Sequence, residues 1–307
     1  MAGFDERDTL FSRMELHAGS PQYDDYYRRN PERKARDDAF RAIQTEFPDT
    51  IALRSMIDAT FSLLEKMRPL ARGMAASERC KVSPEEGTAL LQACAESYGA
   101  VLFGTAQLGD ACFYSTRGRG DEYGQPVEVP GKQGIVFAVT MNPEEIAEAP
   151  NPRAAAEVVN GYMRVAVIGL VVAETIRQWG WNASCTMDGR ADVVWPVAAR
   201  FAGLGSIGRS GLLLTDDYGP CVRLGAVLTD MPLSRTPRKP CTASNLCLTC
   251  KKCAVMCPAK AIDDTISDKG QFGKVDDDAC FAKWKEYGTD CGLCIANCPL
   301  TRKSFND

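Results

Sequence analysis

Histidine is almost missing from this chain of 307 residues, which contains a single one, His17. Zinc sites built on histidine and catalytic pairs of the Ser–His or Cys–His type all need an imidazole at the centre. The sequence therefore excludes these classes of site. His17 itself lies in a polar N-terminal segment, where we expect it to be solvated or locally hydrogen-bonded.

Long hydrophobic runs are also missing. The most apolar stretch, Val165 to Ala173, is bounded by Arg164 and Glu174 and is far shorter than the roughly 20 residues that span a bilayer. No apolar segment follows the first methionine, and Arg28-Arg29 precedes charged residues rather than the hydrophobic region of an export signal. We therefore expect a cytoplasmic protein without a membrane partner.

An excess of positive charge is absent as well. The chain has 36 Lys and Arg residues against 40 Asp and Glu, a net charge of −4. Nucleic acids are bound by clustered basic residues, so we expect no nucleic-acid partner. With 45% hydrophobic residues, the chain can bury the core of one large domain and a smaller one.

Cysteine, in contrast, is abundant, and two motifs near the C-terminus predict iron–sulfur clusters. The first motif is Cys247-x2-Cys250-x2-Cys253-x3-Cys257-Pro258, and the second is Cys291-x2-Cys294-x3-Cys298-Pro299. In this spacing three close thiolates bind one [4Fe–4S] cluster, and the last cysteine ligates the neighbouring cluster. We assign the first cluster to Cys247, Cys250, Cys253 and Cys298, and the second to Cys257, Cys291 and Cys294.

The second cluster lacks a fourth ligand within its motif, and Cys280 is the best candidate. It precedes Cys291 by eleven residues, a span that suits a short helix returning to the cluster. A structural zinc site is the alternative, but zinc usually takes two separated pairs of ligands. The sequence shows no sign of an oxidising compartment for disulfides. We interpret most of the other six cysteines as ordinary buried thiols: Cys80, Cys94, Cys112, Cys185, Cys221 and Cys241.

Patterning predicts an α+β fold, because strands and helices do not alternate regularly. Residues 1–50 are polar but rich in aromatic side chains, so we expect an extended segment pinned to the core; a main domain (51–231) and a cysteine-rich domain (232–307) follow. Apolar spacing and capping residues predict helices at 50–70, 83–97 and 151–179, and a short helix that begins at Asn142-Pro143. Short apolar runs predict strands at 100–104, 134–141, 193–195 and 222–229.

A glycine loop, Gly203-Leu-Gly205-Ser206-Ile-Gly208, matches the dinucleotide-binding pattern G-x-G-x-x-G. That function needs a strand before the loop and a crossover helix after it. Here a helical stretch (196–202) precedes the loop, and a turn and a strand follow it closely. We therefore predict that Gly203, Gly205, Ser206 and Gly208 approach a different flat or phosphate-bearing ligand.

Taken together, these segments resemble the corrinoid-dependent reductive dehalogenases, in particular their cytoplasmic, respiratory-independent branch, and the related epoxyqueuosine reductases. The resemblance covers nearly the whole chain. It is carried by residues 202–220 and 223–233, the two cysteine motifs and the N-terminal segment 11–38. It implies a nitroreductase-like domain that holds base-off cobalamin, followed by a ferredoxin-like domain with two [4Fe–4S] clusters. Base-off binding needs no lower histidine ligand, which agrees with the near absence of histidine.

In this family a tyrosine above the cobalt supplies a proton, and a neighbouring Lys or Arg tunes it. Tyr162, on the long helix, and Arg209, in the glycine loop, are the matching positions, with Tyr114 and Tyr218 as reserve candidates for the acid. A core tyrosine and a structural ion pair are the ordinary interpretations of Tyr162 and Arg209. A tyrosine, with a pKa near 10, is a usable acid when an arginine stabilises its phenolate.

The resemblance predicts that a halogen on a small organohalide, which we expect to be aromatic, is replaced by hydrogen. With no fused reductase domain, an external low-potential donor such as a ferredoxin, flavodoxin or reductase is expected. One alternative is epoxyqueuosine reductase-like epoxide reduction, for which Asp188 and Asp192 lie in the wrong local pattern. Another is a non-catalytic electron carrier or corrinoid-handling protein.

Overall fold

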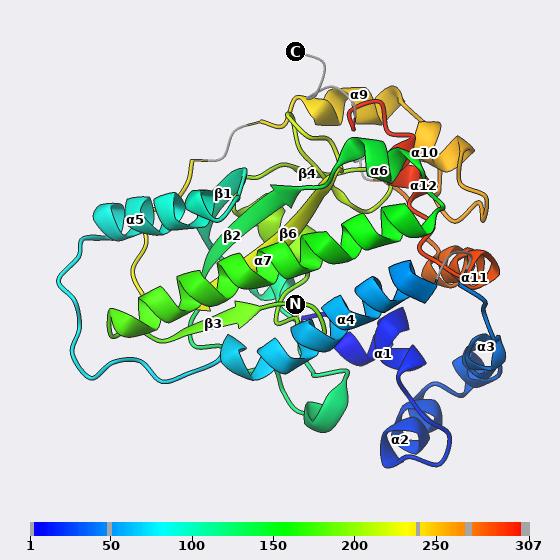
Figure 1. Cartoon of the computed structure of the whole chain (residues 1–307), viewed down its shortest axis with the longest axis horizontal. Coiled ribbons are helices and arrows are strands. Elements are labelled where there is room, and N and C mark those ends of the chain that lie inside the picture. The colour runs from blue at the N-terminus through cyan, green and yellow to red at the C-terminus, as the bar shows by residue number, and fades with distance from the viewer. Residues whose placement is uncertain (1–2, 48–50, 238–239, 268–271, 302–307) are drawn as a thin grey trace.

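A four-stranded antiparallel sheet forms the centre of the molecule in the computed structural model, which describes residues 3–47, 51–237, 240–267 and 272–301. The strand order is β1-β2-β6-β3 (Figure 1). The strands are β1 (Leu102–Gln107), β2 (Gln133–Thr140), β3 (Ala183–Thr186) and β6 (Val222–Thr229). The central pair, β2 and β6, is in register from Gln133↔Thr229 to Thr140↔Val222. Both strands are largely buried because helices cover both faces of the sheet, which explains their continuous apolar sequences.

One long helix, α7 (Pro152–Gln178), crosses a face of this sheet (Figure 1). The Asn151 side chain accepts a hydrogen bond from the Arg153 N–H, and Pro152 occupies the first turn, as is typical of helix starts. By length and apolar composition α7 could span a membrane. Here its apolar residues pack on the sheet and on α4 (Ile51–Met67), as in the core helix of a globular domain.

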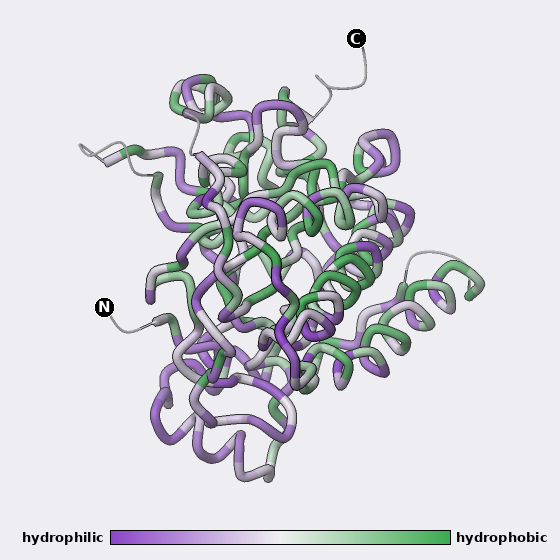
Figure 2. The backbone as a smooth tube through the Cα atoms, turned by 90° about the vertical axis from the view of Figure 1, so that its left-hand side faces the viewer, coloured by the Kyte–Doolittle hydropathy of each residue, from purple (hydrophilic) through white to green (hydrophobic). Residues whose placement is uncertain are grey.

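The other helices of the core are shorter. On the opposite face, α8 (Trp195–Phe201) packs against β2 and β6. Helix α5 (Pro84–Ser97) lies on the same face as α7 and packs on that helix and on β1. A two-stranded hairpin, β4 (Ser206–Ile207) and β5 (Leu213–Leu214), follows α8 directly. Figure 2 shows hydrophobic segments gathered where the sheet and its helices lie, with hydrophilic segments at the periphery.

The cysteine motifs form a group of short helices at one end of the sheet (Figure 1). These are α9 (Ala243–Thr249), α10 (Lys252–Val255), α11 (Asp277–Tyr287) and α12 (Leu293–Ala296). Helix α12 contacts both α10 and α6 (Pro143–Ala147), and α6 in turn packs on α7. The cysteine-rich part therefore lies against the N-terminal end of the long core helix.

Most predicted elements are confirmed, including the mixed helix-and-strand composition, but three predictions need correction. Residues 193–195 are not a strand, because Pro196 lies in the first turn of α8 and Trp195 already begins that helix. Strand β3 was missed, since its four residues, Ala-Ser-Cys-Thr, carry no apolar run. The third error is that the N-terminal segment is not extended in its described part, residues 3–47.

That segment forms three helices, α1 (Leu10–Met14), α2 (Pro21–Arg29) and α3 (Pro31–Ala42). Proline in the first turn starts both α2 and α3, and the Ser20 side chain caps α2 by accepting from the Tyr23 N–H. The aromatic residues counted as anchors do pack together, because Tyr23, Tyr26 and Tyr27 are buried as one cluster. Residues 48–50 of the predicted segment lie outside the described part.

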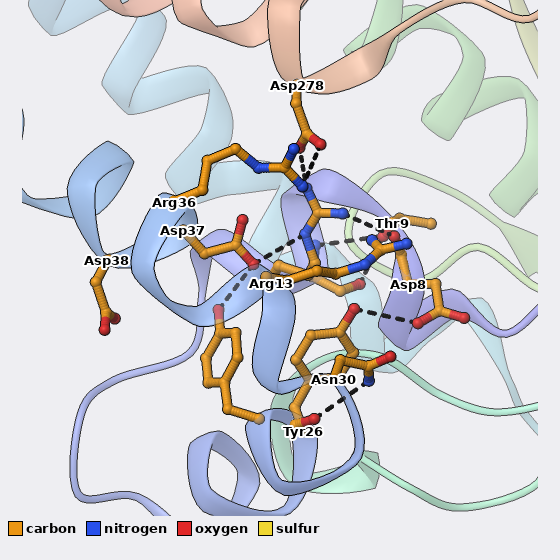
Figure 3. A network of polar contacts seen from close by, with 12 residues as sticks. Asp8, Thr9, Arg13, Tyr26, Asn30, Arg36, Asp37, Asp38 and Asp278 are labelled. Atoms are coloured by element: carbon orange, nitrogen blue, oxygen red, sulfur yellow. Dashed lines mark hydrogen bonds and ion pairs between the residues drawn. The ribbon is translucent and has the colours of Figure 1, made fainter.

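A buried ion-pair network joins these N-terminal helices to α11 (Figure 3). Arg13 Nε lies 3.2 Å from Asp37 Oδ2, and both side chains are fully buried. The Arg13 guanidinium also contacts Asp278 on α11, and Arg36 lies 2.5 Å from the same carboxylate. Three separate segments of the chain are therefore held at one buried point.

Removing one partner of this network should destabilise the fold strongly. Asp37→Asn leaves a buried guanidinium without its partner on α3, and we expect the free energy of unfolding to fall by about 3–5 kcal/mol. The matched control is Arg28→Gln, because the Arg28 side chain in the pair with Asp25 is 77% exposed. Its effect should stay below about 1 kcal/mol. Urea unfolding followed by circular dichroism measures the free energy of unfolding of both variants. An equal loss of stability in Asp37→Asn and Arg28→Gln would contradict this account of the network.

Candidate functional site

Eight cysteines come together in two adjoining groups of four. In the first group, burial raises the pKa of Cys298, and the thiols of Cys247 and Cys250 raise it further. Burial and the thiols of Cys247 and Cys298 likewise raise the pKa of Cys253. The structure thus places together the four residues that the spacing assigned to one cluster.

The second group includes Cys280. Burial raises the pKa of this thiol to about 11, with further contributions from Cys291 and Cys257. Burial also raises the pKa of Cys294 to about 12, and its neighbours include Cys280, Cys291, Cys257 and, from the first group, Cys253. Because the Cys253 thiol contributes to the raised pKa of Cys294, the two groups lie side by side.

The path of the chain explains how Cys280 reaches this group. Asp276 caps α11 by accepting a hydrogen bond from the Ala279 N–H. At the other end, Gly288 has a φ of 70°, a left-handed conformation that glycine adopts without strain. The helix therefore stops sharply and returns the chain to Cys291.

The spacing of the sulfur atoms favours clusters over zinc. Tetrahedral zinc, with Zn–S distances of about 2.3 Å, would hold its sulfurs about 3.8 Å apart. In the described part of the chain, which includes all eight cysteines, no three cysteine sulfurs lie within 4.8 Å of one another. The wider arrangement fits thiolates bound to different irons of one cluster.

Tyr162 lines a cavity between the core and the cysteine-rich part. The cavity measures about 170 Å³ and is enclosed by α7, α8, the β4–β5 hairpin, β6 and α12. Its lining residues are Tyr162, Trp195, Pro196, Leu212, Leu213, Pro220, Val222, Arg223, Leu224 and Ile295. Ile295 lies within the second cysteine motif, between Cys294 and Cys298. The phenol and the predicted cluster motif therefore border the same space.

Two buried donors line this cavity without a hydrogen-bond partner in the described part of the chain. Arg223 Nε and Trp195 Nε1 are buried and make no hydrogen bond within the described residues. Leaving a buried donor unsatisfied costs about 1–3 kcal/mol, so such groups usually have a function or a ligand as partner. An acceptor on a bound molecule would satisfy both donors.

The guanidinium beside Tyr162 belongs to Arg223, whose Cζ lies 5.0 Å from the centroid of the phenol ring. The charge of Arg223 lowers the pKa of Tyr162, but burial, Asp188 and Asp290 together outweigh it, so the pKa is raised overall. The phenol is therefore held protonated beside a cation that would stabilise its phenolate. This arrangement suits a proton donor.

Arg209 lies elsewhere, which corrects the pairing expected from the sequence. Its guanidinium nitrogens donate to backbone carbonyls at the first cysteine motif and beyond it, those of Leu248, Cys250 and Thr265. Arg223 was missed because it was counted as part of a predicted strand. A lone charge inside an otherwise apolar strand was the available signal, because charged residues are rarely buried without a purpose.

The glycine loop turns directly into the β4–β5 hairpin, not into a helix, so the structure has no dinucleotide-binding βαβ unit at this loop. A Cβ on Gly205 would lie 2.3 Å from the Leu214 carbonyl oxygen, so the hairpin needs glycine there. Ser206 and Gly208 border a second cavity of about 700 Å³. Cofactor binding by Gly203, Gly205, Ser206 and Gly208 stays a prediction.

The reserve candidates for the acid lie outside the Tyr162 cavity. Burial raises the pKa of Tyr114 to about 12, but its ring packs against Phe4 at the N-terminus. Asp192 is buried and held in an ion pair by Arg117. Neither these residues nor Asp188 and Tyr218 line the cavity.

Comparison with known proteins points to reductive dehalogenases. No family model matches the sequence. The tetrachloroethene reductive dehalogenase of Sulfurospirillum multivorans is 37% identical over 180 residues, which cover 55% of this chain and 35% of that protein. The epoxyqueuosine reductase of Atelocyanobacterium thalassa is a weaker relative, 37% identical over 84 residues that cover 27% of this chain and 26% of that protein.

The fold agrees with this similarity. The structure of the catabolic reductive dehalogenase NpRdhA in complex with 3-bromo-4-hydroxybenzoic acid matches with a TM-score of 0.78 at 21% identity, over 99% of this chain and 42% of that chain. The resemblance to reductive dehalogenases is therefore confirmed in sequence and in fold. The chain spans about a third of the length of the curated reductive dehalogenases it matches.

Loss of Cys280 should remove one intact cluster and leave the other. We expect the anaerobically reconstituted Cys280→Ala variant to lose one of two [4Fe–4S] signals in electron paramagnetic resonance, because only three thiolates remain. Cys241→Ala is the control, since that thiol bonds to the Leu214 carbonyl and to Asp216. Two unchanged signals in Cys280→Ala would show that Cys280 is not a ligand.

Removing the charge of Arg223 should raise the pKa of Tyr162 further, because a nearby cation stabilises the phenolate. The change is measured by ultraviolet pH titration of Arg223→Gln, with Tyr162→Phe identifying the contribution of this phenol. Arg164→Gln is a control on the same helix, because its guanidinium donates to the Thr140 carbonyl. A larger shift in the control than in Arg223→Gln would contradict the assignment.

Proposed function

We propose that this chain forms the catalytic core of a reductive dehalogenase that uses cobalamin and two [4Fe–4S] clusters. The proposal includes a nitroreductase-like domain followed by a ferredoxin-like one. One observation carries it: Tyr162 and Arg223 meet in a cavity whose wall includes Ile295 of the second cysteine motif. A proton donor and an electron-carrying motif thus serve the same space, in a chain similar to reductive dehalogenases.

In chemical type the residues present fit these cofactors, but the cavity of about 170 Å³ is too small to enclose a whole corrinoid, so a bound ring would extend beyond it. The two groups of cysteines would hold the clusters. At the cavity, apolar side chains such as Leu212, Leu213 and Pro220 suit the face of a flat ring. The unpaired donors of Trp195 and Arg223 suit oxygen acceptors at its rim. The base-off state is consistent with His17, which is exposed in the N-terminal segment.

Replacing a carbon-bound halogen by hydrogen consumes two electrons and one proton and releases halide. Cobalamin, when bound, would supply the reducing chemistry for cleaving the carbon–halogen bond. Tyr162 donates the proton from its hydroxyl to carbon. Arg223 stabilises the resulting phenolate, and the apolar lining keeps water away, which strengthens this attraction.

We propose that an external low-potential donor, such as a ferredoxin, flavodoxin or reductase, supplies the electrons. Large apolar side chains are exposed within the first cysteine motif, between Cys253 and Cys257, with Val255 at 65% and Met256 at 47%. Exposed apolar groups next to a redox centre suit a transient docking site. The substrate is proposed to be a small organohalide, in line with the aromatic expectation from the sequence.

Tyr162→Phe should abolish turnover without disturbing the cofactors. After anaerobic reconstitution with iron, sulfide and cobalamin, we expect halide release, driven by a low-potential dye, to fall by about 10²–10⁴-fold. The visible spectra of the clusters and of cobalamin should stay unchanged. Tyr114→Phe is the matched control and should retain activity.

Full activity in Tyr162→Phe would exclude this residue as the acid. Cobalamin absent from the wild-type protein after gel filtration would instead favour an electron carrier. Conversion of the epoxide in a modified tRNA nucleoside, without halide release, would favour an activity like that of the epoxyqueuosine reductases.

A further inference from the structure

We propose that Arg209 is the buried counter-charge of the cluster held by Cys247, Cys250, Cys253 and Cys298, and that it keeps the reduction potential of this cluster high. The inference rests on the proposed function in one respect, namely that a [4Fe–4S] cluster occupies these four cysteines. It gives Arg209 a redox role in place of the acid–base role expected from the sequence.

The backbone and the side chain of Arg209 both engage the first cysteine motif. The Arg209 N–H donates to Cys247 Sγ at 3.4 Å. Its Nε donates to the Cys250 carbonyl at 3.3 Å, and the two terminal nitrogens donate to Leu248 at 3.2 Å and Thr265 at 3.3 Å. The guanidinium therefore follows the backbone that wraps the sulfur atoms.

In the described part of the chain, no carboxylate lies within ion-pair distance of this buried guanidinium, although its charge lowers the pKa of Asp263. Arg209 is 1% exposed, and in the described part of the chain its polar partners are the carbonyls above and the face of Phe272, 5.0 Å from its Cζ. Arg13 and Arg117, also buried, each pair with a buried aspartate. A desolvated cation without an anion is costly, so a negatively charged partner is expected at this point.

The cluster would be that partner. Four thiolates on a [4Fe–4S] core give a net charge of about −2 when oxidised and −3 after one-electron reduction. A fixed positive charge in a buried, low-dielectric setting stabilises the more negative state more strongly. The N–H···S bond to Cys247 acts in the same direction, because hydrogen bonds to cluster sulfurs help set the potential. The reduction is a single-electron step from the external donor, with no proton transferred and no covalent bond broken.

The glycine loop explains how Arg209 comes so close. A Cβ on Gly208 would lie 3.6 Å from Cys247 Sγ, in ordinary contact, so the chain passes the sulfur at short range. Arg209 follows in the turn between β4 and β5, which belongs to the core. The core thus places a charge directly on the cysteine-rich part.

The test is a redox titration of the reconstituted protein followed by electron paramagnetic resonance. In Arg209→Gln we expect the reduction potential of one cluster to fall by at least about 59 mV. For a one-electron couple this is a tenfold change in the reduction equilibrium constant. The other couple should stay unchanged. Arg209→Lys keeps the positive charge but loses the planar guanidinium. Its reduction equilibrium constant for this cluster should therefore change by less than tenfold.

Arg177→Gln is the matched control. Arg177 is 4% exposed, and its guanidinium likewise donates to backbone carbonyls, those of Leu70, Ala71 and Ala183, but it also forms an ion pair with the exposed Glu174. It lies at the opposite end of α7 from the cysteine-rich part (Figure 1). Its loss should weaken the fold while leaving both potentials unchanged.

The outcomes separate this inference from the proposed function. Both clusters present in Arg209→Gln with both potentials unchanged would overturn the role of Arg209 alone. Should Arg209→Gln not load the first cluster, Arg209→Lys decides: a tenfold or larger downward shift in that variant overturns the charge argument, and a smaller one supports it. A wild-type protein that binds no cluster at this motif would overturn the proposed function as well.

Discussion

Close contact between helix α7 and the central sheet is the constraint on which the candidate site depends. A Cβ on Gly161 would lie 2.5 Å from Arg223 Cγ, and one on Gly169 would lie 2.5 Å from Cys185 Sγ. These two glycines let the helix settle directly on β6 and β3. Tyr162 follows Gly161 in the chain, so the same contact brings its phenol next to the Arg223 guanidinium. Any larger residue at 161 would separate the two groups on which proton donation is proposed to depend.

Buried or half-buried guanidinium groups occur at three junctions between parts of the fold. Arg13 joins the N-terminal helices to α11, which carries Cys280. Arg223 lies where the core meets the second cysteine motif, and Arg209 where the core hairpin meets the first. Their partners differ: carboxylates for Arg13, a phenol for Arg223, and backbone carbonyls for Arg209. The partner, more than the residue type, decides what each charge does.

Local signals in the sequence predicted much of this structure. Helix starts at Ser83-Pro84 and Asn151-Pro152 were readable because capping and proline act within one turn. Continuous apolar runs revealed β2 and β6 because both strands are covered on two faces. Sequence patterns failed to predict β3, whose residues form a short and largely polar stretch. They also failed at Trp195, where the following proline starts helix α8 instead of continuing a strand. The aromatic N-terminal segment was placed on the core but not recognised as helical.

By itself, the sequence determined the cysteine groups, the long core helix and the resemblance to reductive dehalogenases, because each depends on residue type and spacing along the chain. Only the tertiary structure decided which arginine faces Tyr162. Arg209 and Arg223 are fourteen positions apart, and the intervening hairpin sends one to the cysteines and the other, on β6, to the phenol. Such a choice depends on strand pairing and on helix packing across distant segments, which no local pattern encodes.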